Sequence, residues 1–338
     1  MRAVALDFNE RRLIEWDAPA PRILRQDEVL FQVEEVGVCG TDRELALFHL
    51  GHPPEGESRL VIGHEAFGRV RATGSAVRSF QPGDCVVPMI RRRCPAVCPS
   101  CARGRFDLCT TGQYGERGIY GLHGYFCELA VDSERDLVAV PPELASFAVL
   151  AEPLSVVEKA VSMAVAFRQE PAGAALVLGA GPIGLLAALA LRLRGLEVHL
   201  QSLEPPGHPR ARLVRAAGAA YLGPRQSLPP ADIVVEATGS AQAAFNAIRA
   251  LAPLGVCALL GAGEGQGHVS FRDLVVGNRV VFGSVNAGRD SFALAIEDLG
   301  RADPNFLNAM VERRPFADFP RSLADPSSGT AKIAHVIR

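Results

Sequence analysis

Four cysteines lie close together in the first half of the chain, with the spacing C-x3-C-x2-C-x7-C. Four thiolates on a short loop complete the tetrahedral coordination of a zinc ion and leave no open position, which is typical of a structural site. Four unrelated thiols are the alternative, but thiols crowded this closely would be prone to oxidation without a metal. The spacing therefore predicts a structural zinc bound by Cys94, Cys98, Cys101 and Cys109.

A second group of potential metal ligands is spread along the chain. Cys39 stands in a Cys-Gly-Thr-Asp segment, His64 and Glu65 follow a glycine, and Glu152 precedes a proline. A thiolate, an imidazole and a carboxylate bind zinc with one position left for water or substrate, as a catalytic metal requires. A Cys or His alone would more often be a core residue. Their combination with a nucleotide-binding pattern favours a catalytic zinc bound by Cys39, His64 and an acidic residue.

A glycine-rich turn, Gly-Ala-Gly-Pro-Ile-Gly, lies between an apolar strand expected at 174–178 and a helix expected at 185–194. Its first glycine permits a tight turn, the second lets a pyrophosphate approach the backbone, and the third lets helix and strand pack closely. The helix N-terminus offers free N–H groups to the phosphates. A loop with glycines by chance is the alternative, but this context favours a dinucleotide site formed by Gly179, Gly181, Pro182, Ile183 and Gly184.

The end of the next expected strand, 198–202, indicates which dinucleotide binds. An acid there binds the ribose hydroxyls of NAD, whereas an Arg accommodates the 2′-phosphate of NADP. Ser202 and Glu204 stand at this place, with Glu204 twenty residues after the last glycine. The sequence therefore favours NAD, although Arg210 and Arg212 lie close enough along the chain to leave NADP open.

Two patterns of secondary structure are expected to position these residues. Up to about residue 150, short β-rich runs at 29–36, 69–72 and 85–88 alternate with Gly and Pro, which suggests a β-barrel or sandwich. One or two helices are expected at 147–168. From residue 174, strands alternate with helices, as in a doubly wound parallel sheet. We therefore expect an α/β protein with a catalytic domain at 1–156, a Rossmann dinucleotide-binding domain at 157–286, and a segment at 287–338 that returns to the catalytic domain through a strand at 332–337.

Composition excludes several classes of partner. The net charge of −2 and the scattered basic residues give no reason to expect nucleic acid or an anionic membrane. Lys occurs only at positions 159 and 332, which we interpret as genome composition. The longest apolar run is too short to span a membrane, and no signal peptide is visible, so we expect a cytoplasmic protein. In that compartment, eight cysteines indicate metal binding or buried thiols more than disulfides.

Taken together, these residues resemble the zinc-containing medium-chain dehydrogenase/reductase superfamily, which includes the alcohol dehydrogenases. The run Gly-His-Glu-Ala-Phe-Gly at 63–68, followed by Gly74 and Val77, matches its zinc signature. Within the superfamily, the chain is most similar to the glucose 1-dehydrogenases best known from archaea. That likeness rests on Arg91-Arg92, on Gln-Tyr-Gly-Glu-Arg-Gly-Ile at 113–119, on Glu-Pro-Leu at 152–154 with Glu158-Lys159, and on Gly-Ser-Val-Asn at 283–286.

The resemblance implies a GroES-like catalytic domain and an NAD(P)-dependent enzyme that oxidises the C1 hydroxyl of an aldose to a lactone. It implies Cys39, His64 and Glu65 as zinc ligands, with Glu152 binding the metal directly or through water. Asp42 would orient His64, and Thr41 would relay the proton. Glu116 and Asn286 would contact sugar hydroxyls, with Asn286 also near the nicotinamide. Members of the superfamily form dimers or tetramers, so a homo-oligomer is expected.

Three departures and several alternatives bear on substrate and site. The interval between Cys94 and Cys98 is one residue longer than the superfamily's usual C-x2-C, the nucleotide domain is shorter than in several relatives, and Ile90 and Val156 stand where some sugar-oxidising members have polar residues. A polyol or L-threonine dehydrogenase therefore stays open. A non-catalytic zinc- and nucleotide-binding protein would be marked by loss of Cys39 or His64, and both are present. A redox switch at the clustered cysteines is a third alternative.

Overall fold

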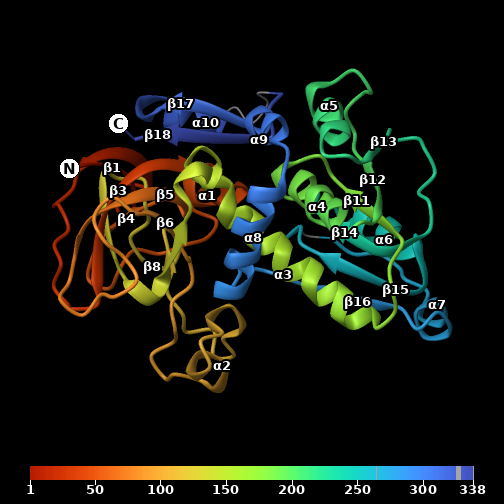
Figure 1. Ribbon diagram of the computed structural model, residues 1–338, viewed down its shortest axis with the longest axis horizontal. Helices are drawn as coiled ribbons and strands as arrows, with labels where there is room; N and C mark the ends of the chain where they lie inside the picture. Colours follow the sequence, from red (N-terminus) through yellow and green to blue (C-terminus); the bar gives the residue numbers. More distant parts are fainter. Residues whose placement is uncertain (264, 325–328, 338) are drawn as a thin grey trace.

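The structure is a computed structural model that describes residues 1–263, 265–324 and 329–337. Figure 1 shows a β-rich half, formed mainly by the N-terminal part of the chain, and an α/β half, with the helices α3 (Ala151–Arg168) and α8 (Arg289–Arg301) between them. This arrangement has the expected β-rich first half and the expected parallel sheet in the second half.

The β-rich half is built from two mainly antiparallel sheets around one apolar core and a short parallel pair, β7 (Glu116–Arg117) and β8 (Gly121–Leu122). In its central strand, the alternate residues Val29, Phe31 and Val33 are buried, because successive side chains point to opposite faces of a sheet. The strands expected at 29–36, 69–72 and 85–88 are confirmed. The larger sheet contains β3 (Glu28–Gly37), β5 (Glu65–Thr73), β6 (Cys85–Pro88), β9 (Leu129–Ser133), β10 (Leu137–Val140), β17 (Val311–Pro315) and β18 (Lys332–Val336), and the smaller one β1 (Arg2–Asp7), β2 (Arg12–Asp17) and β4 (Arg59–Val61).

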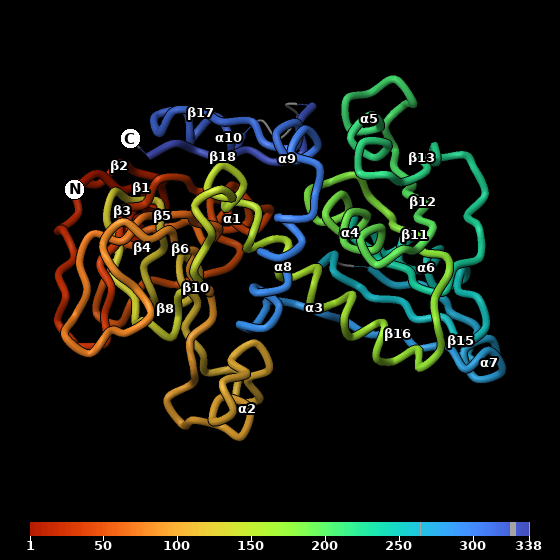
Figure 2. The backbone as a smooth tube through the Cα atoms, in the orientation of Figure 1, coloured from red at the N-terminus to blue at the C-terminus, as the bar shows by residue number. Residues whose placement is uncertain are grey.

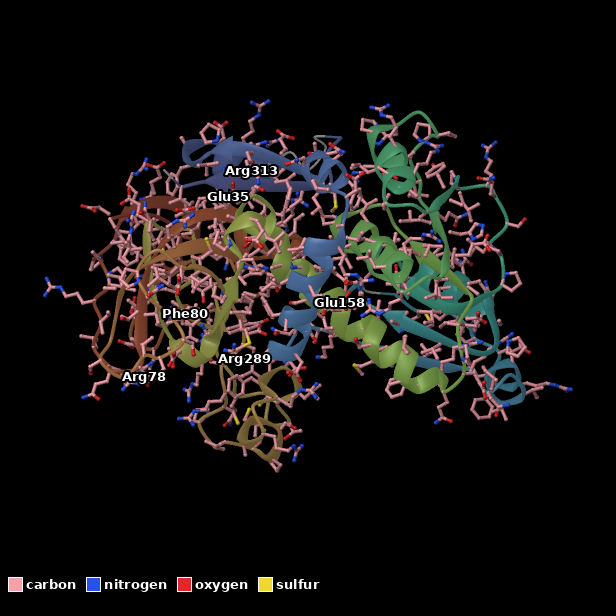
Figure 3. The ribbon with its side chains drawn as sticks, viewed as in Figure 1. Glu35, Arg78, Phe80, Glu158, Arg289 and Arg313 are labelled. Carbon is pink, nitrogen blue, oxygen red and sulfur yellow. The ribbon has the colours of Figure 1, made fainter. Side chains whose placement is uncertain are left out.

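The end of the chain returns to this first half. The strand β18 pairs antiparallel with β3 and parallel with β17, which confirms the strand expected at 332–337. Figure 2 shows the two termini near each other at the edge of the β-rich half. Glu35 and Arg313, neighbours in Figure 3, form an ion pair of 2.6 Å that joins β3 to β17. Residues far apart in the sequence therefore meet beside the end of β3.

The α/β half contains a six-stranded, fully parallel sheet with the strand order β13-β12-β11-β14-β15-β16. In order of sequence this is 3-2-1-4-5-6, the Rossmann order, which places ligands at the carboxyl ends of the strands. Its strands are β11 (Ala174–Leu178), β12 (Glu197–Gln201), β13 (Ala220–Leu222), β14 (Ala231–Glu236), β15 (Leu251–Leu259) and β16 (Val280–Gly283).

The helices that support this sheet are of two kinds. The helix α4 (Pro182–Leu193) is apolar around nearly its whole circumference, because it is buried between the sheet and other helices. Arg194, directly after the end of α4, forms ion pairs both with Glu158 of α3, at the centre of Figure 3, and with Asp298 of α8, and so joins the three helices. The remaining helices are α1 (Gly40–Ala46), α2 (Pro99–Ala102), α5 (Pro209–Ala216), α6 (Ala241–Arg249), α7 (Phe271–Val276), α9 (Pro304–Met310) and α10 (Phe319–Ala324).

The segment expected to form one or two helices at 147–168 is a 3-10 helix, Pro142–Leu150, that continues into α3. The helix α6 ends at Arg249, because Leu251 already belongs to the strand β15 and is buried. None of the helices in the described part of the chain has both the length and the hydropathy that crossing a membrane would require.

Candidate active site and metal centres

Three potential metal ligands meet where β3, α1 and β5 come together. Cys39 caps the N-terminus of α1, two residues after β3 ends, and Glu65 is the first residue of β5. Since Glu65 pairs with Gly37 across the sheet, the two segments are held in register. The ligand atoms of Cys39, His64 and Glu65 all lie within 4.8 Å of one another. The sheet therefore brings together three of the residues expected at a catalytic zinc.

Asp42 contacts two of these three ligand residues. Its carboxylate accepts a hydrogen bond from the backbone N–H of Cys39 at 2.8 Å and lies 3.5 Å from Nδ1 of His64. Asp42 and His64 are both buried. Burial lowers the pKa of His64, but Asp42 more than offsets this effect and raises it above the ordinary value. A carboxylate behind a histidine fixes the ring and makes its other nitrogen a stronger metal ligand.

Lys332 is a residue of this site that the sequence did not reveal. Its ammonium group forms an ion pair with Glu65 and donates a hydrogen bond to the carbonyl oxygen of Val38 at 3.0 Å. Burial opposes the charge of Lys332, but Glu65 and Cys39 outweigh that effect and raise its pKa. Gly37 leaves room for the pair, because a Cβ there would lie 2.3 Å from a Glu65 oxygen and 2.8 Å from Cε of Lys332.

The sequence did contain a signal for this residue. Only two of the 35 Lys and Arg residues are lysines, and both Lys159 and Lys332 are buried. Lysines are rarely buried unless they are paired. The rarity of Lys, interpreted above as genome composition, is thus also a signal for two positions that are buried and paired.

Glu152 and Thr41 lie next to the group of potential metal ligands. Glu152 is half-buried in the first turn of α3, where burial and the carboxylate of Glu65 raise its pKa to about 7. Its oxygens do not belong to the group formed by Cys39, His64 and Glu65. The hydroxyl of Thr41 lies 3.8 Å from the sulfur of Cys39. The geometry thus favours Glu65 as the carboxylate ligand and leaves Glu152 in an outer position.

These residues fit a zinc ion. One sulfur, one ring nitrogen and one carboxylate oxygen form a donor set that zinc prefers, with one position open. His64 is 4% exposed and Glu65 2%, whereas Cys39 lies at the wall of a cavity. Buried anionic side chains are stable only when a positive charge compensates them, and Lys332 supplies part of this positive charge.

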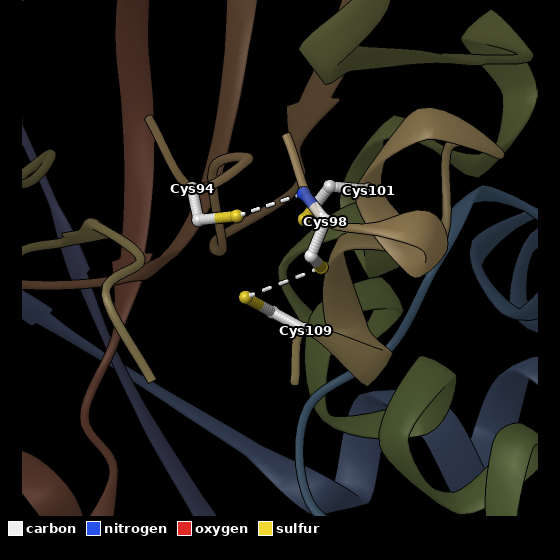
Figure 4. Close-up of side chains that lie close together, drawn as sticks. All are labelled: Cys94, Cys98, Cys101 and Cys109. Carbon is white, nitrogen blue, oxygen red and sulfur yellow. Dashed lines mark hydrogen bonds between the residues drawn. The ribbon is translucent and has the colours of Figure 1, made fainter. Parts of the chain in front are cut away.

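The four clustered cysteines form a second candidate metal centre in a lobe that Figure 1 shows projecting from the β-rich half around α2. Their sulfur atoms point toward one another (Figure 4) and lie within 4.8 Å. The sulfurs of Cys98 and Cys109 are 3.9 Å apart. Zn–S bonds of about 2.3 Å in a tetrahedron require sulfurs separated by about 3.8 Å. All eight cysteines of the chain are free thiols, so this cluster is available to a metal.

A turn accommodates the additional residue between Cys94 and Cys98. The N–H of Val97 donates to the carbonyl of Cys94 at 3.0 Å, and Val97 adopts a left-handed φ of 47°. The backbone N–H of Cys98 then donates to the Cys94 sulfur at 3.3 Å. Backbone N–H groups of Thr110 and Cys101 lower the pKa of Cys98, which favours the thiolate that binds metal. Cys94 is therefore placed in the cluster despite the additional residue.

The glycine-rich turn has the shape that a dinucleotide site needs. Gly179 has a φ of +104°, and a Cβ on Gly184 would lie 1.8 Å from the Gly179 carbonyl oxygen. A Cβ on Gly181 would meet open space, so a phosphate can approach the backbone there. Pro182 begins α4, where its missing N–H is not needed.

Two cavities extend from this turn. One, of about 440 Å³, is bordered by the turn, by the end of β12 with Ser202 and Glu204, and by α6. The other, of about 330 Å³, joins the two halves of the molecule: Cys39 and Glu65 lie on one side, and Gly181, Pro182 and Ile183 on the other. Two of the predicted metal ligands, Cys39 and Glu65, therefore line one cavity with the predicted pyrophosphate site.

Two arginines lie at this junction: Arg210, which the sequence indicated as a possible contact of a cofactor phosphate, and Arg43, which it did not indicate. Arg43 of α1 and Arg210 of α5 both border the cavity of about 330 Å³, together with Lys332. Arg210 also forms an ion pair of 3.0 Å with Glu204. Ser202 and Arg210 lower the pKa of Glu204, although its partial burial opposes this. Arginine side chains beside a helix N-terminus suit phosphate groups.

Glu116 and Asn286 lie apart from the metal ligands. Neither borders the cavity that contains Cys39. Instead, the amide nitrogen of Asn286 donates to Glu116 at 2.8 Å, and Glu116 also pairs with Arg91 at 2.8 Å. Because Asn286 follows β16 and Glu116 belongs to the β-rich half, this contact joins the two halves of the molecule.

Comparison with known proteins gives the family. The family described as "Alcohol dehydrogenase GroES-like domain" matches residues 25–142, and "Glucose dehydrogenase C-terminus" matches residues 145–334. The chain belongs to the glucose dehydrogenase family. It is 40% identical over 337 residues to the glucose 1-dehydrogenase of Methanocella arvoryzae, covering 93% of each chain. It is 42% identical to that of Thermoproteus tenax, covering 85% of this chain and 84% of the other.

A solved structure shares the complete fold of this glucose dehydrogenase family member. The Haloferax mediterranei glucose dehydrogenase in complex with NADP, Zn and gluconolactone has a TM-score of 0.90 and 32% sequence identity, over 99% of both chains. The resemblance to zinc-containing medium-chain dehydrogenases that the motifs indicated is therefore confirmed.

Proposed function

We propose that the chain oxidises the C1 hydroxyl of an aldose, with glucose as the foremost substrate, to the corresponding lactone, and transfers the hydride to NAD⁺ or NADP⁺. One observation carries the proposal: Cys39 and Glu65 share a cavity with the glycine-rich turn of the nucleotide sheet. The relatives described above are named glucose 1-dehydrogenases, and one was solved with gluconolactone. A polyol or L-threonine dehydrogenase would use the same metal ligands and is the second candidate.

When bound, zinc supplies a Lewis acid that lowers the pKa of a substrate hydroxyl, and the nicotinamide supplies the hydride acceptor. Cys39, His64 and Glu65 would hold the zinc at this site, and the four clustered cysteines would hold a structural zinc. Asp42 orients His64, and Lys332 restrains Glu65. The hydroxyl of Thr41 accepts the substrate proton and passes it outward, and Glu152 hydrogen-bonds a substrate hydroxyl or a water molecule.

Glu116 and Asn286 would bind other hydroxyls of the sugar. Their mutual hydrogen bond holds two polar groups at the junction of the two halves. Fixing the sugar at several hydroxyls keeps the C1 hydrogen in a reactive position.

For the cofactor, we propose NAD as the preferred acceptor, although the Haloferax structure contains NADP. Glu204 already neutralises Arg210, and its carboxylate would repel a 2′-phosphate. Glu204→Gln should free Arg210 for a charge-assisted hydrogen bond of about 1.5–3 kcal/mol, and so raise the NADP⁺/NAD⁺ ratio of kcat/KM by roughly 10- to 100-fold. Glu197→Gln, at the opposite end of β12, is the control and should leave the ratio unchanged. A wild type that prefers NADP⁺, with a ratio insensitive to Glu204→Gln, would refute this preference.

The substrate is tested by initial rates of NAD⁺ and NADP⁺ reduction with a panel of aldoses, polyols and L-threonine. Glucose carrying deuterium at C1 should transfer that deuterium to the nicotinamide and yield gluconolactone. Faster turnover of polyols or L-threonine than of every aldose would favour the second candidate.

The homo-oligomer expected from the resemblance has a candidate surface. In the described sheet order β16 is an outermost strand, and the neighbouring helix α7 exposes Phe271, Val275 and Val276. A second copy could pair with this edge and cover the apolar side chains, as isologous dimers do. Light scattering of the wild type and of Val276→Glu tests this: the variant should be a monomer, and a monomeric wild type would refute it.

A further inference from the structure

The lobe that contains the clustered cysteines is tied to the loop that follows β16 by a buried ion pair. Nζ of Lys159, on α3, lies 2.9 Å from Oδ2 of Asp107 and donates a hydrogen bond to the carbonyl of Val285 at 3.0 Å. The Lys159 side chain is 5% exposed and that of Asp107 is fully buried. Asp107 stands two residues before Cys109, so one ammonium group joins the cysteine lobe to the loop at 284–288.

A second connection runs parallel to the first. Arg91 donates to the backbone carbonyl of Asp107 at 3.1 Å and to Glu116 at 2.8 Å, and Glu116 accepts the amide of Asn286 at 2.8 Å. The loop also passes directly over Asp107, because a Cβ on Gly288 would lie 3.0 Å from Oδ1 of Asp107. Both connections therefore begin at Asp107 and end at adjacent residues of the loop.

The loop needs such support. Asn286 adopts a left-handed φ of 60°, a conformation that few residues other than glycine and asparagine tolerate. Val285 is 66% exposed, so apolar packing does not hold this part of the loop in place, whereas Ala287, two residues further on, is buried in the core. The loop follows the carboxyl end of β16, the edge of the sheet at which a dinucleotide binds.

We infer that Asp107 and Lys159 are positioning residues, through which the metal-bearing cysteine lobe sets the place of Val285 and Asn286 at the substrate and nicotinamide end of the cleft. This inference rests on the proposed function for the role of the loop. It also gives a role to Lys159, one of only two lysines in the chain, which is buried. The cysteine lobe then contributes to turnover as well as to stability.

The test compares Lys159→Met and Asp107→Asn with Arg105→Gln in the zinc-loaded protein. Arg105 contacts the same carboxylate at 3.3 Å but is 46% exposed, which makes it a matched control. Backbone hydrogen exchange at 284–288 should become at least about tenfold faster in the two variants and stay unchanged in the control. All proteins should retain the same zinc content.

Kinetics provide the second readout. A misplaced substrate loop lowers the rate by roughly 10- to 100-fold, so kcat/KM for the sugar should fall by that factor in Lys159→Met and Asp107→Asn. The double variant should lose no more than the worse single variant, because both act in one relay. The Kd of NAD(P)H should change less than twofold, since the adenosine end of the cleft is distant from the loop.

Unchanged exchange at 284–288, or losses that add in the double variant, would overturn the inference. Asp107→Asn preserves shape, so it decides the question if Lys159→Met does not fold. Hydrogen exchange does not depend on the substrate. If the wild type does not oxidise aldoses but the two variants still show faster exchange, the proposed function is refuted and the coupling between the cysteine lobe and the loop at 284–288 stands.

Discussion

Replacing Lys332 by Met tests whether its ammonium group compensates the negative charge of Glu65 when no metal is bound. The side chains of Lys332 and Glu65 are 1% and 3% exposed, and Met keeps most of the apolar stem. Removing one partner of a buried ion pair costs about 3–5 kcal/mol, because the other charge stays buried without compensation. At roughly 2–4 °C per kcal/mol, the melting temperature of the zinc-free protein should fall by about 10 °C.

Zinc should reverse most of this loss. A cation bound to Cys39, His64 and Glu65 compensates the carboxylate that Lys332 leaves behind, so the variant and the wild type should melt less than about 5 °C apart when zinc is present. Scanning calorimetry of both proteins, stripped by a chelator and reloaded with zinc, measures the two differences.

Arg313→Met is the matched control for this experiment. Arg313 pairs with Glu35 in the same sheet, but its side chain is 31% exposed, and exposed ion pairs contribute only about 0–1 kcal/mol. An equal loss for Lys332→Met with and without zinc, or a loss no larger than that of the control, would refute the reasoning.

Further predictions concern the metal ligands and the glycine-rich turn. Cys39→Ser should remove the catalytic zinc and nearly all turnover with an unchanged circular dichroism spectrum; wild-type-like activity would discredit the assignment. Cys101→Ser should lower the melting temperature, and an unchanged value would count against a structural zinc. Gly184→Ala should destabilise the fold, because its Cβ would lie 1.8 Å from the Gly179 carbonyl, whereas Gly181→Ala should fold normally and raise the Kd of NAD(P)H. Calorimetry and cofactor fluorescence compare the two glycine variants, and similar melting temperatures would contradict the packing argument.

Local patterns were sufficient to predict much of the fold. The strand–glycine turn–helix unit at 174–194 and the alternation of strands and helices after it are properties of neighbouring residues, and the structure has them. The strand at 332–337 was also recognisable from its residues. Its partner was not, because a pairing between β18 and β3 is decided by the tertiary fold.

The sequence could not complete the site for the same reason. Lys332 donates to the carbonyl of Val38, 294 positions away, and no local pattern connects the two. Whether Glu65 or Glu152 faces the metal depends on how the first turn of α3 packs against β5, which only the assembled structure shows. Glu116 and Asn286 were recognised by resemblance alone, and their contact with each other across the two halves was not predicted.

Zinc content measured together with activity tests the central claim most directly. Protein stripped of metal and titrated with zinc should regain glucose-dependent NAD(P)⁺ reduction up to two zinc ions per chain, and anomalous diffraction at full activity should show one ion between Cys39, His64 and Glu65. Full activity in protein whose pocket at these residues contains no ion would contradict the account.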